Sequence, residues 1–196
     1  YISLLIPARY GSLSVAPLEH VAFLVKHQAL LYAWNLVIYI AFGASLVVAG
    51  LALHQRLKVG APNLANSATA FALIWAGLVI ASGMVANIGA KVVIALHAKD
   101  PALAASTWLA LSFVVNGLGG GNEVVGGLWM LLVSLAALQI RALPKALNYL
   151  GLVVSVAGLL TVVPALGELG SVFGLGSILW FNALGVVMLR DGMVKP

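Results

Sequence analysis

Long apolar stretches constrain this chain more than any other feature of its sequence. Several of them, including residues 32–53 and 67–96, reach or exceed the roughly 20 residues that an α-helix needs to cross a hydrocarbon core of about 30 Å. Of the 196 residues, 63% are hydrophobic and 8% are charged, whereas about a quarter of the residues in a soluble domain are charged. A water-soluble fold could not bury this much apolar surface, so we expect most side chains to face lipid or other helices.

Helices are the expected element of secondary structure. Strands of a membrane β-barrel alternate polar and apolar residues over segments of about 10 residues, and the apolar run at residues 150–163 shows no such alternation. We therefore predict an all-α integral membrane protein with a single domain. The expected architecture is a helical bundle of about four to six transmembrane helices with one interfacial or half-length helix.

Polar and turn-forming residues divide the chain into segments. Residues 17–31 carry Glu19, Lys26 and two histidines, and residues 102–116 number only about 15. We expect these two segments to be interfacial or partial helices. Residues 1–7 are interpreted as the end of an earlier helix. The predicted spans are residues 32–53, 67–96, 124–140, 148–166 and 172–189.

The basic residues predict the orientation of the bundle. If residues 102–116 do not cross, one side of the membrane holds six of the ten Lys and Arg residues, namely Arg56, Lys58, Arg141, Lys145, Arg190 and Lys195. On the opposite side, four basic residues are balanced by acids: Arg9, Lys26, Lys91 and Lys99 with Glu19, Asp100, Glu123 and Glu168. Basic loops favour the cytoplasm, so we predict a cell-membrane protein with a cytoplasmic C-terminus. The basic residues form no stripe, which argues against a nucleic-acid partner.

The glycine-rich run at residues 117–127 is the most distinctive local feature. Glu123 lies in it, and an acid at the membrane edge costs several kcal/mol unless it is paired. Glu123 is therefore the first candidate for a ligand-binding residue. The alternative is that Glu123 complements the positive end of a helix, which is worth about 0.3–1 kcal/mol. The neighbours that complete the candidate site are Asn116, Gly120, Gly121 and Asn122.

Three histidines form a second candidate site. His20 and His27 are seven residues apart and share a helix face, and His97 falls on the same predicted side of the membrane. With Glu123 they offer ligands for a metal ion or haem iron. A zinc pair on a helix usually sits at i and i+4, so this spacing is not specific, and solvated interfacial histidines are the alternative. No motif in the sequence predicts a cofactor, and the absence of cysteine excludes thiolate sites.

Amides inside the predicted spans are expected to join helices. In a membrane, such side chains most often bridge neighbouring helices, for about 0.6–2 kcal/mol each. The residues concerned are Asn35, Asn87, Asn148 and Asn182.

Two sequence segments resemble a known family. The run GGNEVVGGLW at residues 120–129, followed by an apolar span and by LPKALNYLG at residues 143–151, is similar to the bacterial multi-pass membrane proteins grouped as domain of unknown function 4386. The resemblance covers residues 102–192. It implies a bundle of about six helices and supplies no catalytic residues, because that family has no established activity.

Three functions are compatible with these features. The first is a non-enzymatic accessory or structural subunit of a larger membrane complex, held by lipid and by a partner membrane protein or a second copy. It is favoured by abundant small residues and by the scarcity of ionisable groups within the spans. The second is a transporter or binder of a small or lipophilic ligand that enters from the extracytoplasmic side near Glu123. The third is a haem or metal membrane enzyme that uses His20, His27 and His97.

Overall fold

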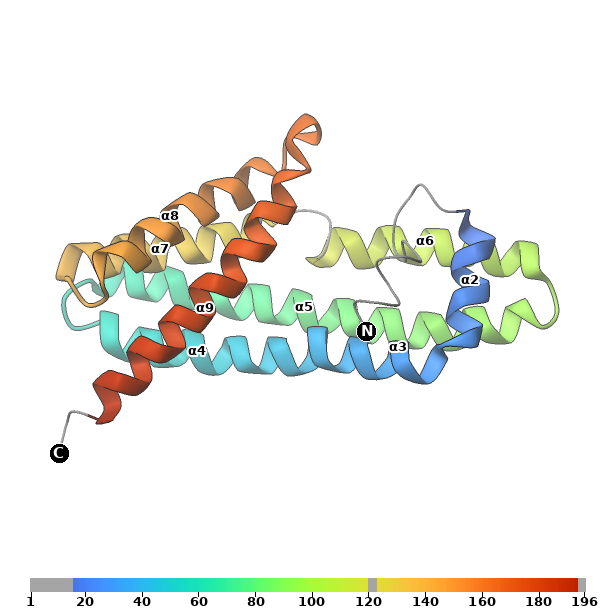
Figure 1. Ribbon diagram of the computed structural model, residues 1–196, viewed down its shortest axis with the longest axis horizontal. Helices are drawn as coiled ribbons and strands as arrows, with labels where there is room; N and C mark the ends of the chain where they lie inside the picture. The colour runs from blue at the N-terminus through green and yellow to red at the C-terminus, as the bar shows by residue number, and fades with distance from the viewer. Residues whose placement is uncertain (1–15, 120–122, 194–196) are drawn as a thin grey trace. The chain divides into compact units, whose positions relative to one another are not determined.

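The computed structural model describes residues 16–119 and 123–193, and it is helical apart from short turns (Figure 1). No strand occurs in these two ranges. Residues 1–7, Gly120, Gly121 and Asn122, which carried sequence predictions, lie outside them. The helices are α2 (Pro17–Lys26), α3 (Gln28–Asn35), the π-helix η1 (Leu36–Ala41), α4 (Phe42–Leu57), α5 (Pro62–His97), α6 (Pro101–Gly119), α7 (Val124–Ile140), α8 (Lys145–Leu160), the 3₁₀ helix η2 (Pro164–Leu166) and α9 (Leu169–Met193). The predicted all-α fold class is confirmed for the described part of the chain.

Within the described residues, four helical stretches are long and apolar enough to cross a membrane, judged by length and composition. The third combines α6 and α7, and α8 is a shorter apolar helix. These stretches are consistent with the predicted helical bundle. Their bounds are Gln28–Leu57, Pro62–His97, Pro101–Ile140 and Leu169–Arg190.

Local chemistry explains the ends of several helices. At the start of α6, the backbone N–H of Leu103 donates to Asp100 Oδ1 at 2.9 Å, and Pro101 occupies the first helical position. At the end of α7, Arg141 adopts the left-handed conformation with φ 55°, which terminates the helix.

Two segments differ from their predicted bounds. The helix that begins at Pro17 is interrupted at His27, where φ is −121° and ψ is 25°, earlier than the boundary expected after residue 31. The span predicted at 148–166 is α-helical only to Leu160. Pro164 has no N–H to continue the helix and holds the preceding residue in an extended conformation, so a separate 3₁₀ turn follows.

The chain forms two compact units. Unit 1 comprises Tyr1–Gly43 and Leu78–Leu118, and unit 2 comprises Ala44–Gly77 and Gly119–Pro196. The long helix α5 therefore contributes its C-terminal part to unit 1 and its N-terminal part to unit 2.

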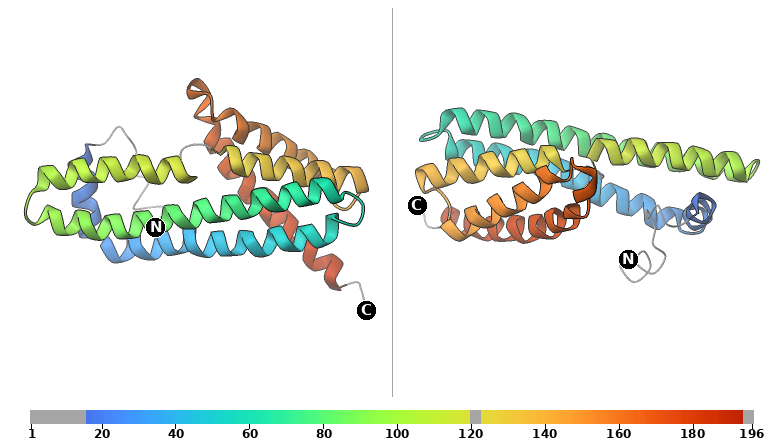
Figure 2. Two further views of the ribbon diagram at one scale, coloured as in Figure 1. Left: turned by 180° about the vertical axis from the view of Figure 1, so that it is seen from behind. Right: turned by 90° about the horizontal axis from the view of Figure 1, so that it is seen from above.

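In unit 1, the helix α2 runs across the direction of α6 and of the second part of α5 (Figures 1 and 2). Its apolar face is buried, whereas Glu19 and Lys26 are exposed. The apolar face of α2 therefore packs within unit 1, and a location of this helix at a membrane interface stays a prediction. α2 contributes Val21 and Leu24 to a core that also contains Leu31, Ala90, Val93 and Ala104.

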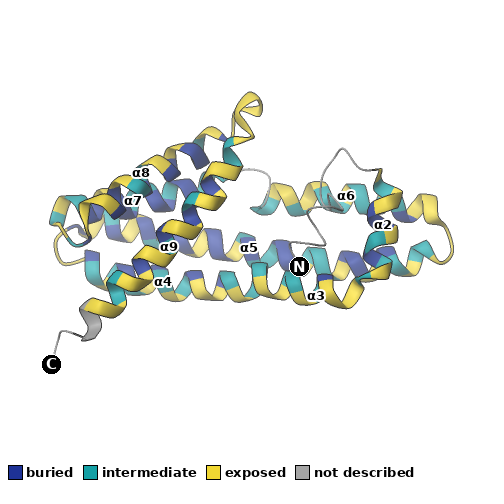
Figure 3. Ribbon diagram, viewed as in Figure 1, coloured by how far each residue is buried: buried dark blue, intermediate teal, exposed yellow. Residues whose placement is uncertain are grey.

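In unit 2, α8 packs against both α7 and α9. Aromatic rings from three helices form its centre: Trp129 of α7 lies 5.7 Å from Trp75 of α5 and 5.6 Å from Trp180 of α9, measured between ring centroids. Trp129 and Trp180 are fully buried. Figure 3 shows the contrast with the outer side of α9, which is largely exposed.

Candidate functional sites

Glu123 immediately precedes α7 in unit 2 and is half-buried. Its side chain makes no capping hydrogen bond to the helix. Its backbone is held firmly, because its N–H donates to Thr161 Oγ1 at 2.8 Å and its carbonyl accepts from the Gly127 N–H at 2.8 Å. The structure therefore fixes the position of this residue through its main chain and leaves the carboxylate available for other interactions.

The end of α8 supplies the anchor for Glu123. Thr161 donates its own hydroxyl to the carbonyl of Gly158 at 2.6 Å while accepting from Glu123. A Cβ at Gly158 would lie 3.1 Å from the Glu123 carbonyl oxygen. The same Cβ would lie 2.5 Å from Phe173 Cδ2 of α9, so glycine at this position allows close packing of α8 against α9 and the start of α7.

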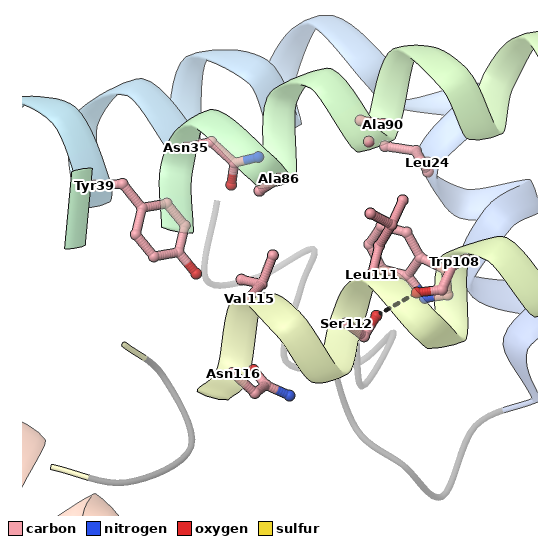
Figure 4. Close-up of a pocket in the computed structure, with 11 residues that line it drawn as sticks. Leu24, Asn35, Tyr39, Ala86, Ala90, Trp108, Leu111, Ser112, Val115 and Asn116 are labelled. Atoms are coloured by element: carbon pink, nitrogen blue, oxygen red, sulfur yellow. Dashed lines mark hydrogen bonds between the residues drawn. The ribbon is translucent and has the colours of Figure 1, made fainter. Parts of the chain in front are cut away.

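A cavity of about 140 Å³ lies within unit 1, and Figure 4 shows the residues around it. It is bordered by α2, by the segment from Asn35 to Tyr39, by α5 and by α6. Leu24, Trp108 and Leu111 form part of its apolar wall. Four polar side chains also line it, namely Asn35, Tyr39, Ser112 and Asn116. Of the described residues that line the cavity, none is charged or is a histidine.

The wall formed by Asn35 and Tyr39 depends on an unusual helix. Tyr39 lies within the π-helix η1, and Asn35 immediately precedes it. π-helical turns occur frequently at functional sites. Figure 4 shows the Tyr39 ring extending from η1 toward the part of α6 that carries Val115. A Cβ at Gly83 would collide with the Cβ of Tyr39, so the glycine lets η1 pack directly against α5.

Hydrogen bonds order the cavity wall. Asn35 Nδ2 donates to Asn87 Oδ1 of α5 at 3.1 Å, which confirms the predicted bridging role for this pair. The Ser112 hydroxyl donates to the Trp108 carbonyl at 2.8 Å. The amides of the other two asparagines expected to bridge helices bond instead within their own segments, Asn148 to the Leu143 carbonyl and Asn182 to the Ile178 carbonyl.

The two described residues of the first predicted site, Asn116 and Glu123, belong to different compact units, and their joint role stays a prediction. Asn116 belongs to unit 1 and lines the cavity, whereas Glu123 belongs to unit 2 and is not among the lining residues. Asn35, Tyr39 and Ser112 were not singled out as ligand-binding residues from the sequence. The sequence held no signal for them, because isolated polar residues in apolar helices more often join helices than bind ligands.

The three candidate histidines all fall in unit 1. The rings of His20 and Trp108 are stacked at a centroid distance of 6.2 Å, and those of His27 and Phe23 lie 4.6 Å apart. His97 Nδ1 is buried and has no hydrogen-bonding partner within the described ranges. Over the same ranges, no group of three or more His, Cys, Asp or Glu residues could hold a metal ion. A haem or metal role for these histidines stays a prediction.

Comparison with known proteins finds no matching protein-family model, no matching curated protein and no matching solved structure. A function is therefore inferred from the residues of this chain alone.

Proposed function

We propose that this chain is a multi-pass membrane protein without catalytic chemistry of its own that serves as a packing subunit, docking the outer face of α9 against a transmembrane helix of a partner protein. The observation that carries this proposal is the exposed Asn182 side chain in the apolar helix α9. One N–H of its amide bonds to the Ile178 carbonyl of the same helix at 2.7 Å, and its Oδ1 has no hydrogen bond to another described residue. Lipid tails offer no hydrogen bonds, so a polar side chain in such a helix is stabilised by meeting another helix.

Asn182 belongs to a stripe that suits helix docking. Gly174, Ile178, Asn182, Gly185 and Leu189 follow one another at intervals of three or four residues and so share one helix face. Neither Gly174 nor Gly185 would bring an added Cβ within 4 Å of another atom. Exposed glycines on an apolar helix let the backbone of a second helix approach closely. We call these five residues the α9 stripe.

The remaining surface of α9 supports a membrane environment. Large apolar side chains off the stripe are also exposed, and Leu175 and Leu179 reach 68% and 64% exposure. Such an outer surface would be unstable in water and is compatible with lipid. The proposal places the polypeptide in the cell membrane, with the α9 stripe facing the partner and the other exposed faces of α9 facing lipid.

A contact within unit 2 supports the proposed orientation. The Arg56 guanidinium donates from Nε and Nη2 to the Ala142 carbonyl at 3.2 and 2.8 Å. The end of α4 and the turn between α7 and α8 therefore lie at the same end of this unit, where Figure 1 also shows the C-terminal end of α9. Clustering of basic residues at one end supports a cytoplasmic location for that end.

Site-specific cross-linking tests the proposed docking face. The chain contains no cysteine, so a single cysteine introduced as Gly185→Cys carries a benzophenone maleimide to one defined position. We expect light to produce one discrete heterologous adduct in native membranes, identifiable by mass spectrometry. The matched control is Leu179→Cys, which is also exposed on α9 but lies off the stripe.

Three outcomes of the cross-linking would contradict the proposal. The docking face is wrong if Gly185→Cys and Leu179→Cys give the same adducts. Adducts to a second copy of this chain would show that the α9 stripe mediates self-association and does not dock on a different protein. Extraction of the protein from membranes by alkaline carbonate, without detergent, would show that it is not an integral membrane protein.

A further inference from the structure

We propose that the cavity in unit 1 is a binding site for a small neutral molecule of the phenol class, with a single six-membered ring and a hydroxyl group that donates a hydrogen bond. The inference goes beyond the proposed packing role and does not depend on it, because no residue of the α9 stripe lines the cavity.

The size of the cavity selects a single ring. Its volume is about 140 Å³, and an engineered apolar cavity of about 150 Å³ holds one benzene molecule. Two aromatic side chains from different helices border the space, Tyr39 of η1 and Trp108 of α6, and they lie on opposite sides of Val115 in Figure 4. Aromatic walls favour a planar ring through stacked or edge-to-face contacts.

The lining determines the charge of the ligand. Among the residues that the structure describes, none that lines the cavity is Lys, Arg, His, Asp or Glu. An ionic ligand would lose its hydration on entering and would find no counter-charge, which is costly in a low-dielectric site. The ligand is therefore neutral.

The hydrogen bonds of the wall indicate a donor group on the ligand. Asn35 uses Nδ2 to reach Asn87, and its carbonyl oxygen points into the space between the side chains drawn in Figure 4. Ser112 uses its hydrogen to reach the Trp108 carbonyl, which leaves lone pairs on its oxygen. Both groups can accept a hydrogen bond from a ligand hydroxyl.

The close packing around the site makes it preformed. Gly83 brings η1 against α5, as described above, and a Cβ at Gly89 would lie 2.7 Å from Leu111 Cδ1 of α6. Ser82 also joins α5 to α6 by donating to the Val115 carbonyl at 3.2 Å. A ligand would thus enter a space bounded by helices that are already in contact, as is usual for small-molecule sites.

Fluorine NMR of the purified protein in detergent tests the proposal, with 4-fluorophenol as the probe. We expect saturable broadening of the probe signal with the wild-type protein. Ala86 lines the cavity, so Ala86→Leu should fill it and weaken binding at least tenfold. The matched control is Ala95→Leu on the same helix α5, at an exposed position. Because both variants are measured in the same micelles, partition of the probe into detergent cancels.

The chemistry of the probe tests the ligand class. Fluorobenzene, which has no hydroxyl, should bind more weakly than 4-fluorophenol, and 4-fluorobenzoate, which is charged, should not bind. If Ala86→Leu does not fold, Val115→Phe fills the same space from α6 and provides the same comparison. Equal binding to the wild-type and a folded cavity-filling variant, or equal binding of the phenol and the benzoate, overturns the proposal.

Discussion

At the start of α7, Glu123 combines a half-buried carboxylate with a firmly bonded backbone. Its side chain does not cap the helix, and its carboxylate forms no ion pair within the part of the chain that the structure describes. Two explanations for an acid at this position differ in their effect on stability. A carboxylate that only complements the helix end stabilises the fold, whereas a partly buried and unpaired carboxylate costs free energy and suits a ligand-binding role.

The substitution Glu123→Gln separates these explanations. We expect the free energy of unfolding in detergent at neutral pH to stay the same or rise, because a partly desolvated charge is removed. The matched control is Glu168→Gln, since Glu168 also immediately precedes a helix but is exposed. That substitution should lower stability by about 0.3–1 kcal/mol. An equal loss in both variants would show that Glu123 only complements the helix.

The hydroxyl of Thr161 is expected to be a major stabilising group. Thr161→Val removes the acceptor for the Glu123 N–H and leaves that donor unpaired. The expected loss is about 1–3 kcal/mol in the free energy of unfolding. Thr107→Val serves as the control, because no hydrogen bond joins the Thr107 hydroxyl to another described residue. Similar losses in the two variants would mean that the bond to Thr161 contributes little.

At the scale of the elements, glycines decide how closely helices approach. Gly151 on α8 faces Ser134 of α7 and Trp180 of α9, and a Cβ there would collide with Ser134 Oγ and lie 2.8 Å from Trp180 Nε1. By contrast, a Cβ at Gly185 on α9 would contact nothing within 4 Å. Packing therefore requires glycine at position 151. The fold of this chain places no such requirement on position 185.

Paired Gly→Ala substitutions test this difference. We expect Gly151→Ala to lower the free energy of unfolding by about 1–3 kcal/mol, because the added methyl group overpacks the contact among three helices. Gly185→Ala should leave stability unchanged or raise it by up to about 1 kcal/mol through helix propensity. Thermal unfolding in the same detergent measures both. A stabilising Gly151→Ala would show that α7, α8 and α9 are not packed this closely.

At the scale of the whole molecule, the threading of the chain through the membrane is still a prediction. It rests on the grouping of basic residues, and the bond between Arg56 and the Ala142 carbonyl supports it for two of the loops. The predicted crossings and the cytoplasmic C-terminus can be tested without reference to any partner, because every introduced cysteine is unique in this chain.

Cysteine labelling from one side of sealed membranes is the measurement. We expect Lys58→Cys and Arg141→Cys to react with a membrane-impermeant maleimide from the cytoplasmic side. Lys99→Cys should react only from the opposite side, since its turn precedes α6 on the other predicted face. Denatured samples control for buried thiols. Reaction of positions 58 and 141 from opposite sides would falsify the predicted threading.

Element type was determined by the sequence itself. Length and hydropathy are local properties of a segment. The long apolar segments of the sequence therefore predicted helices, and helices are found there in the described part of the chain. The start of α6 at Pro101 also depends on local chemistry, since a missing N–H and the capping Asp100 carboxylate act within one turn. The interruption at His27 and the end of α8 at Leu160 could not be predicted in the same way, because the length of an apolar segment does not show where a helix ends within it.

The candidate sites were decided only by tertiary structure. Asn35 bonds to Asn87, and Glu123 bonds to Thr161, and each pair joins residues far apart in the sequence. A cavity arises where helices fail to fill the space between them, and that depends on side chains from every helix around it. No local pattern in one segment contains that information. For this reason the sequence predicted Glu123 and the histidines as ligand-binding residues and did not predict Tyr39 and Ser112.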